Sequence, residues 1–180
     1  MEMLDGLLLA AIFSAAGLWD WAFFKIPNRL LQAALWAGSL WAARQGWETG
    51  AGMGAASALG LFGARMLLAL GIGVVLYLFR AVGAGDVKLA ALIIGILGLQ
   101  RGGAGLGIGF VLAAAWAACR MAGRGMFRER LAFLLGYGRH FLRDPRPRAY
   151  YEQARDGRGA VIPLGLCMVL GVGIESWLGR

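Results

Sequence analysis

Long runs of apolar residues, separated by short polar turns, constrain this chain more than any other feature. The six runs lie at about 3–24, about 28–45, within 51–79, at 86–99, at about 103–121 and at about 161–178. Their apolar residues follow neither the helical nor the alternating period of half-buried elements in soluble proteins. Because a membrane-spanning helix needs roughly 20 mostly apolar residues, the runs predict an all-α, polytopic membrane bundle of about six transmembrane helices.

The composition agrees with a membrane setting. Of the 180 residues, 59% are hydrophobic and 16% are charged, whereas soluble domains are about half apolar and about a quarter charged. Glycine contributes 30 residues, and small residues let membrane helices pack closely. The length suits one membrane-embedded domain over residues 1–180. The start of the chain has no basic region of the kind that opens a secretory signal.

Two of the runs have unusual lengths. The third is long enough to tilt, or to break near Gly60 or Gly63. The fourth runs only from Asp86 to Leu99, which is short for a span. We therefore expect the fourth helix to gain length from the turn that precedes it.

The distribution of lysine and arginine predicts the orientation. On one side of the predicted membrane lie only Arg44, Arg101 and Arg180, Arg65 falls within the third run, and the other 14 of the 18 basic residues lie on the opposite side. Basic residues are retained in the cytoplasm. The 25–29 turn and a basic loop at about 122–160 are therefore predicted to be cytoplasmic, with both termini outside. The net charge of +8 then indicates contact with a membrane surface and not with nucleic acid.

Two aspartates interrupt this apolar pattern. Asp20 lies near the cytoplasmic end of the first run and Asp86 opens the fourth, so two crossings place both at the same membrane face. An aspartate in an apolar helix costs roughly 2.5–3.5 kcal/mol on insertion scales, which favours a functional role. Since two neighbouring carboxylates do not ionise together easily, one can activate water while the other donates a proton. The pair predicts an aspartic peptidase.

Residues beside each aspartate are predicted to shape the site. Gly83 and Gly85 allow backbone conformations and close approaches that other residues do not, and could admit an extended peptide. Lys88 is expected either to pair with a lipid phosphate or to hold the turn. Pro27 and Asn28 are expected to form the other turn and to start the second helix.

Other roles for the two aspartates remain open at this stage. Asp20 could be an interfacial carboxylate paired with Lys25 or Arg29, and Asp86 could be a helix N-cap. A proton-coupled transporter or channel component would also carry carboxylates at matching depth, although transporters usually place them near the midplane between repeated halves.

The chain offers little for metal or cofactor binding. Its one histidine, His140, lies in the basic loop, and no HExxH motif is present. Its two cysteines, Cys119 and Cys167, lie far apart in apolar runs and cannot supply a four-thiolate zinc site. No glycine-rich phosphate fingerprint occurs outside the membrane. We therefore expect neither a metal nor a cofactor.

Three segments together resemble the type IV prepilin peptidases. They are GAGDVK at 83–88, Asp20 followed by KIPNRL at 25–30, and VIPLG at 161–165. The likeness covers nearly the whole chain and is weakest at 121–160. A lone GxGD is common in glycine-rich membrane proteins, whereas its combination with an aspartate and an I-P-N turn is specific.

The resemblance implies a function and a place. Asp20 and Asp86 would be the catalytic dyad of an aspartic endopeptidase that removes the short basic leader of prepilins or pseudopilins. The reaction would occur at the cytoplasmic face of a prokaryotic inner membrane. Implied partners are these substrates, membrane lipids and pilus assembly machinery. A non-enzymatic assembly subunit of a pilus or secretion system is the alternative within this setting.

One departure from the family narrows the expectation. Larger members carry a cytoplasmic region with paired CxxC motifs and also N-methylate the new pilin terminus. This chain lacks those motifs. It resembles the short, peptidase-only branch that often serves tight-adherence (Flp-type) pili, so we expect leader cleavage without methylation.

Overall fold

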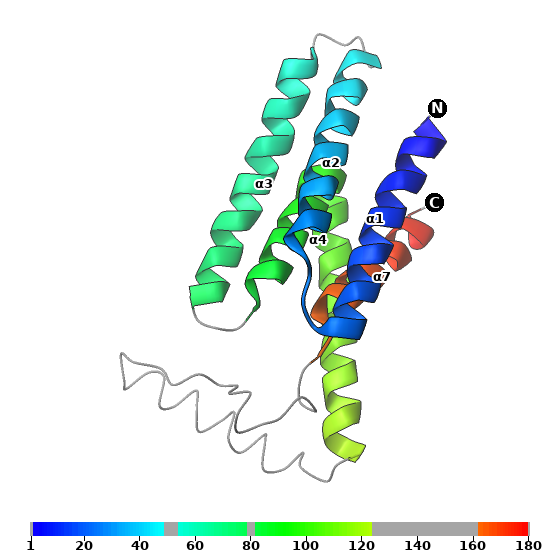
Figure 1. The fold of residues 1–180 in the computed structure, drawn as a ribbon, viewed down its shortest axis with the longest axis vertical. Coiled ribbons are helices and arrows are strands. Elements are labelled where there is room, and N and C mark those ends of the chain that lie inside the picture. The colour runs from blue at the N-terminus through cyan, green and yellow to red at the C-terminus, as the bar shows by residue number, and fades with distance from the viewer. Residues whose placement is uncertain (1, 49–53, 79–81, 124–161, 180) are drawn as a thin grey trace.

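A computed structural model describes residues 2–48, 54–78, 82–123 and 162–179 of the protein. All the regular elements in this part of the chain are helices (Figure 1). They are α1 (Glu2–Phe23), α2 (Asn28–Glu48), α3 (Ala55–Leu78), α4 (Ala84–Gly123) and α7 (Leu164–Leu178). The expected all-helical fold is confirmed for these residues.

Helix α4 is the centre of the bundle. It packs against α2, α3 and α7, while α1 lies against α2 and α7. Figure 1 shows α3 on one side of α4, with α1 and α7 on the other and α2 in front of α4. Leu89 and Ile93 of α4 and Met168 of α7 are almost completely buried, so the core forms where these helices meet.

Gly98 divides α4 into two arms. A straight helix of 40 residues would be about 60 Å long, about twice the thickness of a bilayer core. Gly98 has φ 82° and ψ 171°, a conformation that is essentially restricted to glycine. A Cβ atom at Gly102 would lie 3.0 Å from the Cα atom of Ile94, so the chain folds back on itself (Figure 1). The arms, 84–97 and 99–123, correspond to the fourth and fifth apolar runs.

The other helix boundaries mostly follow the sequence. Helices α1 and α2 match the first two runs closely. Helix α4 begins at Ala84, so the fourth run does gain length from the preceding turn. The break considered near Gly60 or Gly63 is wrong, because α3 is continuous from Ala55 to Leu78. The basic loop expected at 122–160 lies almost entirely outside the described residues.

Glycines bring the second arm of α4 against α7. A Cβ atom at Gly105 would lie 3.0 Å from the Cα atom of Val172, and one at Gly109 would lie 2.7 Å from the Cα atom of Met168. This GxxxG pair therefore packs helices within the bundle, as such motifs do in membranes. The close contact fixes α7 beside α4.

The surface of the bundle suits a lipid environment. Helix α3 and the segment Ala84–Arg120 are long and apolar enough to cross a membrane, and Leu9–Phe23 and Leu164–Leu178 are shorter apolar helices. Only 11% of the most apolar stretch of α3 is buried, and its Leu67, Leu68 and Ile72 side chains are exposed. So large an apolar surface is rare on soluble monomers.

Substituting Gly98 with alanine should destabilise the protein by about 1–3 kcal/mol, because a side chain strains this backbone conformation. Thermal denaturation in detergent micelles measures the loss. Gly103→Ala is the matched control: it lies in the same arm with no atom within 4 Å of a new Cβ, and helix propensity predicts a slight gain. Equal stability of the Gly98→Ala variant and the parent would contradict the strained reversal.

Candidate active site

Asp20 lies in the last turn of α1. Its side chain is only 6% exposed, and no other charged side chain is buried among the residues that the structure describes. Phe24, with φ 52°, donates its N–H to the Asp20 backbone carbonyl at 2.8 Å. This left-handed residue ends the helix and turns the chain toward Ile26 and Pro27.

The start of α7 holds the Asp20 carboxylate. The Gly165 N–H donates a hydrogen bond to Asp20 Oδ2 at 2.8 Å. The backbone N–H of Leu166 also hydrogen-bonds to this carboxylate. The first N–H groups of a helix lack partners within it, and its dipole favours a negative charge there. A Cβ atom at residue 165 would lie 3.0 Å from Asp20 Oδ2, so glycine allows this approach.

Asp86 lies in the first turn of α4 and is half-buried. The Val87 N–H donates to the Gly83 carbonyl at 3.1 Å, and the helix starts at Ala84, so Asp86 is its third residue. Asp86 is therefore not the N-cap residue itself, although its carboxylate accepts a hydrogen bond from the Gly83 backbone, as an acidic residue at the third helical position of a capping box does. A Cβ atom at Gly83 would lie 3.0 Å from Asp86 Oδ2, which places the carboxylate over this glycine.

Gly83 and Gly85 both have ordinary backbone angles, so what they can offer the site is the absence of a side chain. Among the described residues, Gly98 is the only glycine with positive φ. The expectation that Gly83 and Gly85 provide special conformations is therefore wrong, whereas a close approach does occur. It occurs at Gly83, beside the Asp86 carboxylate, whereas a Cβ atom at residue 85 would lie 3.5 Å from the Cβ atom of Ile26, an ordinary van der Waals contact.

Ile26 connects the two aspartate-bearing segments. Its Cδ1 atom would lie 3.0 Å from a Cβ atom at Gly165, and its other side faces Gly85. The side chain thus contacts the start of both α7 and α4. Asp20 lies close enough to Asp86 for the charge of one carboxylate to act on the other, so the structure brings together the two aspartates that the sequence paired.

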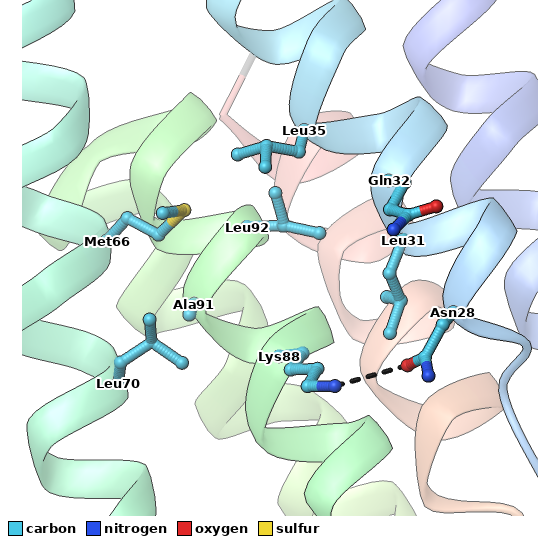
Figure 2. A pocket seen from close by; sticks show the side chains of 9 residues that line it. All are labelled: Asn28, Leu31, Gln32, Leu35, Met66, Leu70, Lys88, Ala91 and Leu92. Atoms are coloured by element: carbon cyan, nitrogen blue, oxygen red, sulfur yellow. Dashed lines mark hydrogen bonds between the residues drawn. The ribbon is translucent and has the colours of Figure 1, made fainter.

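Asn28 and Lys88 form a second connection between the same segments. Lys88 Nζ donates a hydrogen bond to Asn28 Oδ1 at 3.1 Å, across 60 positions of sequence (Figure 2). The Pro27 carbonyl accepts from the Leu30 N–H at 3.0 Å, and α2 starts at Asn28. The expectation that Pro27 and Asn28 form the turn and start the second helix is confirmed.

The alternative ion pairs of Asp20 are not formed. Lys25 and Arg29 are exposed while Asp20 is buried, and the described residues include no ion pair between them. Asp20 is instead held by the α7 backbone.

Sequence reasoning missed Ile26 and Gly165 as parts of this site. Each lies within a segment that carries the family resemblance, but neither carries a chemical group that marks a role. Only the position of Gly165 could have indicated its role. It lies two residues after Pro163 at the start of an apolar run, where the N-terminus of a helix is expected.

Metal ligands do not gather in the described part of the chain, where no group of three or more His, Cys, Asp or Glu residues could hold an ion. Cys119 is exposed and Cys167 is buried, and both are free thiols. His140 lies outside the described residues. The absence of a cofactor stays a prediction.

Comparison with known families gives this arrangement a context. The model of the type IV leader peptidase family matches residues 7–121. The chain belongs to this family. The matched region of the chain includes Asp20, the turn after it and Asp86, but ends before α7. The chain has no match among curated proteins or among solved structures.

Proposed function

We propose that this family member is an aspartic endopeptidase that cleaves the leader peptide of type IV prepilin-like proteins with Asp20 and Asp86. One observation carries the proposal: two aspartates, 66 positions apart in sequence, lie at the same end of the bundle within electrostatic range. Each carboxylate lies beside the start of a helix: Asp20, in the last turn of α1, against the start of α7, and Asp86 in the first turn of α4.

The different surroundings of the two carboxylates suggest different roles. Asp20 accepts an N–H bond at a helix N-terminus, which favours its ionised form. In the proposed reaction Asp20 takes a proton from water as the water oxygen bonds to the peptide carbonyl carbon. Asp86, protonated and more exposed, donates its proton to the carbonyl oxygen. The proton on Asp20 then passes to the leaving amine as the C–N bond breaks. One hydroxyl of the tetrahedral carbon returns its proton to Asp86 as the C=O bond re-forms, which restores both carboxyl groups.

The proposed topology has six membrane crossings within a single domain, 1–180, in the prokaryotic inner membrane. The support is the folding back of α4 at Gly98 into two arms, which adds one crossing to the five helices. Lys25, Arg29 and Lys88 lie in the same segments as the two aspartates, and the bias of basic residues predicted from the sequence favours the cytoplasmic face for the site. A transporter would instead place its carboxylates near the midplane, whereas these two lie at helix ends.

The cleavage product tests the peptidase-only character. Purified protein in lipid vesicles should cleave a co-reconstituted prepilin after its basic leader. With a methyl donor present, the mature pilin should keep a free N-terminal amine, because the paired CxxC motifs of the methylating members are missing. Mass spectrometry of the product gives the cleavage site and the terminus together. An N-methylated terminus produced by this protein alone would contradict the assignment, and an uncut prepilin would contradict the proposed activity.

A further inference from the structure

A groove lies between α2, α3 and α4, on a face that the proposed chemistry does not use. Its volume is about 330 Å³, within the range of small-ligand sites. Figure 2 shows Asn28 and Lys88 at one end of the groove, while Leu35 and Met66 lie farther along it. The groove therefore has one polar end and apolar walls.

The groove is separate from the aspartates. Lys88 follows Asp86 by two residues, which turns its side chain by about 200° around the helix. None of the residues that line the groove contributes to the contacts of Asp20 described above. A peptide bond held between the aspartates would therefore lie on the other side of α4.

The surroundings of the groove favour a lipid chain as its occupant. Along α3, the exposed Leu67 and Leu68 lie between the lining residues Met66 and Leu70, so the groove borders the apolar surface of the bundle. From Asn28 to Leu35 it follows about 10 Å of α2. In a bilayer, acyl chains are the solvent of such an apolar surface.

The polar end carries a positive charge at the level of the lipid headgroups. Lys88 is exposed and gives one of its three N–H donors to Asn28, which leaves two for a ligand. In the proposed topology this end faces the cytoplasmic leaflet, whose anionic lipids attract basic residues. A phosphate at Lys88 with an acyl chain toward Leu35 and Met66 matches both the charge and the apolar walls.

We propose that this groove is a binding site for one anionic phospholipid, with its phosphate at Lys88 and one acyl chain between α2, α3 and α4. The inference rests on the proposed membrane topology but not on the peptidase chemistry. It assigns the apolar groove to a membrane component and not to the substrate.

Photo-crosslinking tests the site directly. The full-length protein is placed in phosphatidylcholine nanodiscs that contain a trace of phosphatidylglycerol with a diazirine in one acyl chain. We expect crosslinks at residues around Leu35 and Met66, located by peptide mass spectrometry. Unlabelled phosphatidylglycerol should compete about fivefold better than phosphatidylcholine, the effect of one basic residue near an anionic headgroup.

Three variants distinguish binding in the groove from a general attraction of anionic lipids to the basic surface of the protein. Lys88→Gln should remove the fivefold preference, while Lys25→Gln, an exposed lysine outside the groove, should keep it. Gln32→Trp, at an exposed position of the lining, should lower crosslinking for either headgroup by filling the space. Circular dichroism in nanodiscs verifies that each variant is folded.

Several outcomes would overturn the proposal. If Lys25→Gln and Lys88→Gln lost the preference for phosphatidylglycerol equally, the lipid would be held only by general attraction to the basic surface of the protein. Competition by inorganic phosphate would mean an anion site, and displacement by an uncut prepilin with crosslinks to its own chain would assign the groove to substrate. Because the readout does not require cleavage, an inactive peptidase would leave the lipid result interpretable.

Discussion

Replacing Asp20 or Asp86 with asparagine is expected to lower leader cleavage by about 10²–10⁴-fold, the contribution of a positioned acid or base. Asparagine keeps the shape of the side chain but can neither take a proton from water nor donate one to the peptide. Cleavage of a co-expressed prepilin, followed by the mobility of the product, measures the effect. Insertion and stability of each variant should match the parent, because the amide oxygen of the Asp20→Asn side chain can still accept the Gly165 N–H bond.

Glu48→Gln provides a matched control for the loss of a carboxylate. Glu48 pairs with Arg44 at 3.0 Å, at the far end of α2, and exposed pairs of this kind contribute little to stability. This variant should cleave at the parental rate. Substantial cleavage by either aspartate variant would remove that residue from the catalytic role, and full activity of both would favour a non-enzymatic assembly subunit.

Gly165→Ala is expected to reduce cleavage about 10–100-fold without preventing folding. The new Cβ atom would lie 3.0 Å from both Asp20 Oδ2 and Ile26 Cδ1, so these side chains must shift by a few tenths of an ångström. A displacement of about 1 Å in a catalytic group can cost about 10²-fold in rate. The rate constant at saturating prepilin should fall more than the apparent affinity, because Gly165 acts through Asp20.

Gly173→Ala, in the same helix, tests whether the effect is specific to the site. No atom lies within 4 Å of a Cβ at this position, so cleavage and stability should stay close to parental values. If Gly165→Ala cleaved as fast as Gly173→Ala, the hydrogen bond from α7 to Asp20 would not position the carboxylate.

Local sequence was enough to predict the helical fold of the described residues and the proximity of the two aspartates, whereas their catalytic pairing and the six membrane crossings stay predictions. The apolar runs have the length of bilayer spans, and their boundaries agree with α1 and α2 closely. The pairing of Asp20 with Asp86 needed only the number of crossings between them, since an even number returns the chain to the same face. These conclusions depend on hydrophobicity along the chain and not on which helices touch.

The tertiary structure alone decided which groups surround the two carboxylates. In the sequence Gly83, Gly98 and Gly165 are three of 30 similar glycines. Only packing shows that Gly98 reverses α4, Gly83 lies under Asp86, and Gly165 donates its N–H to Asp20.

The contacts of Ile26 and Lys88 were equally invisible in the sequence. The bond from Lys88 to Asn28 spans 60 positions, and Ile26 meets two helix starts, at Ala84 and Leu164, that follow it by 58 and 138 positions. Local periodicity reports which face of a helix is apolar but not which partner covers it. Such contacts arise only when the packing of α2 and α7 against α4, and of α1 against α7, fixes the helix ends in place.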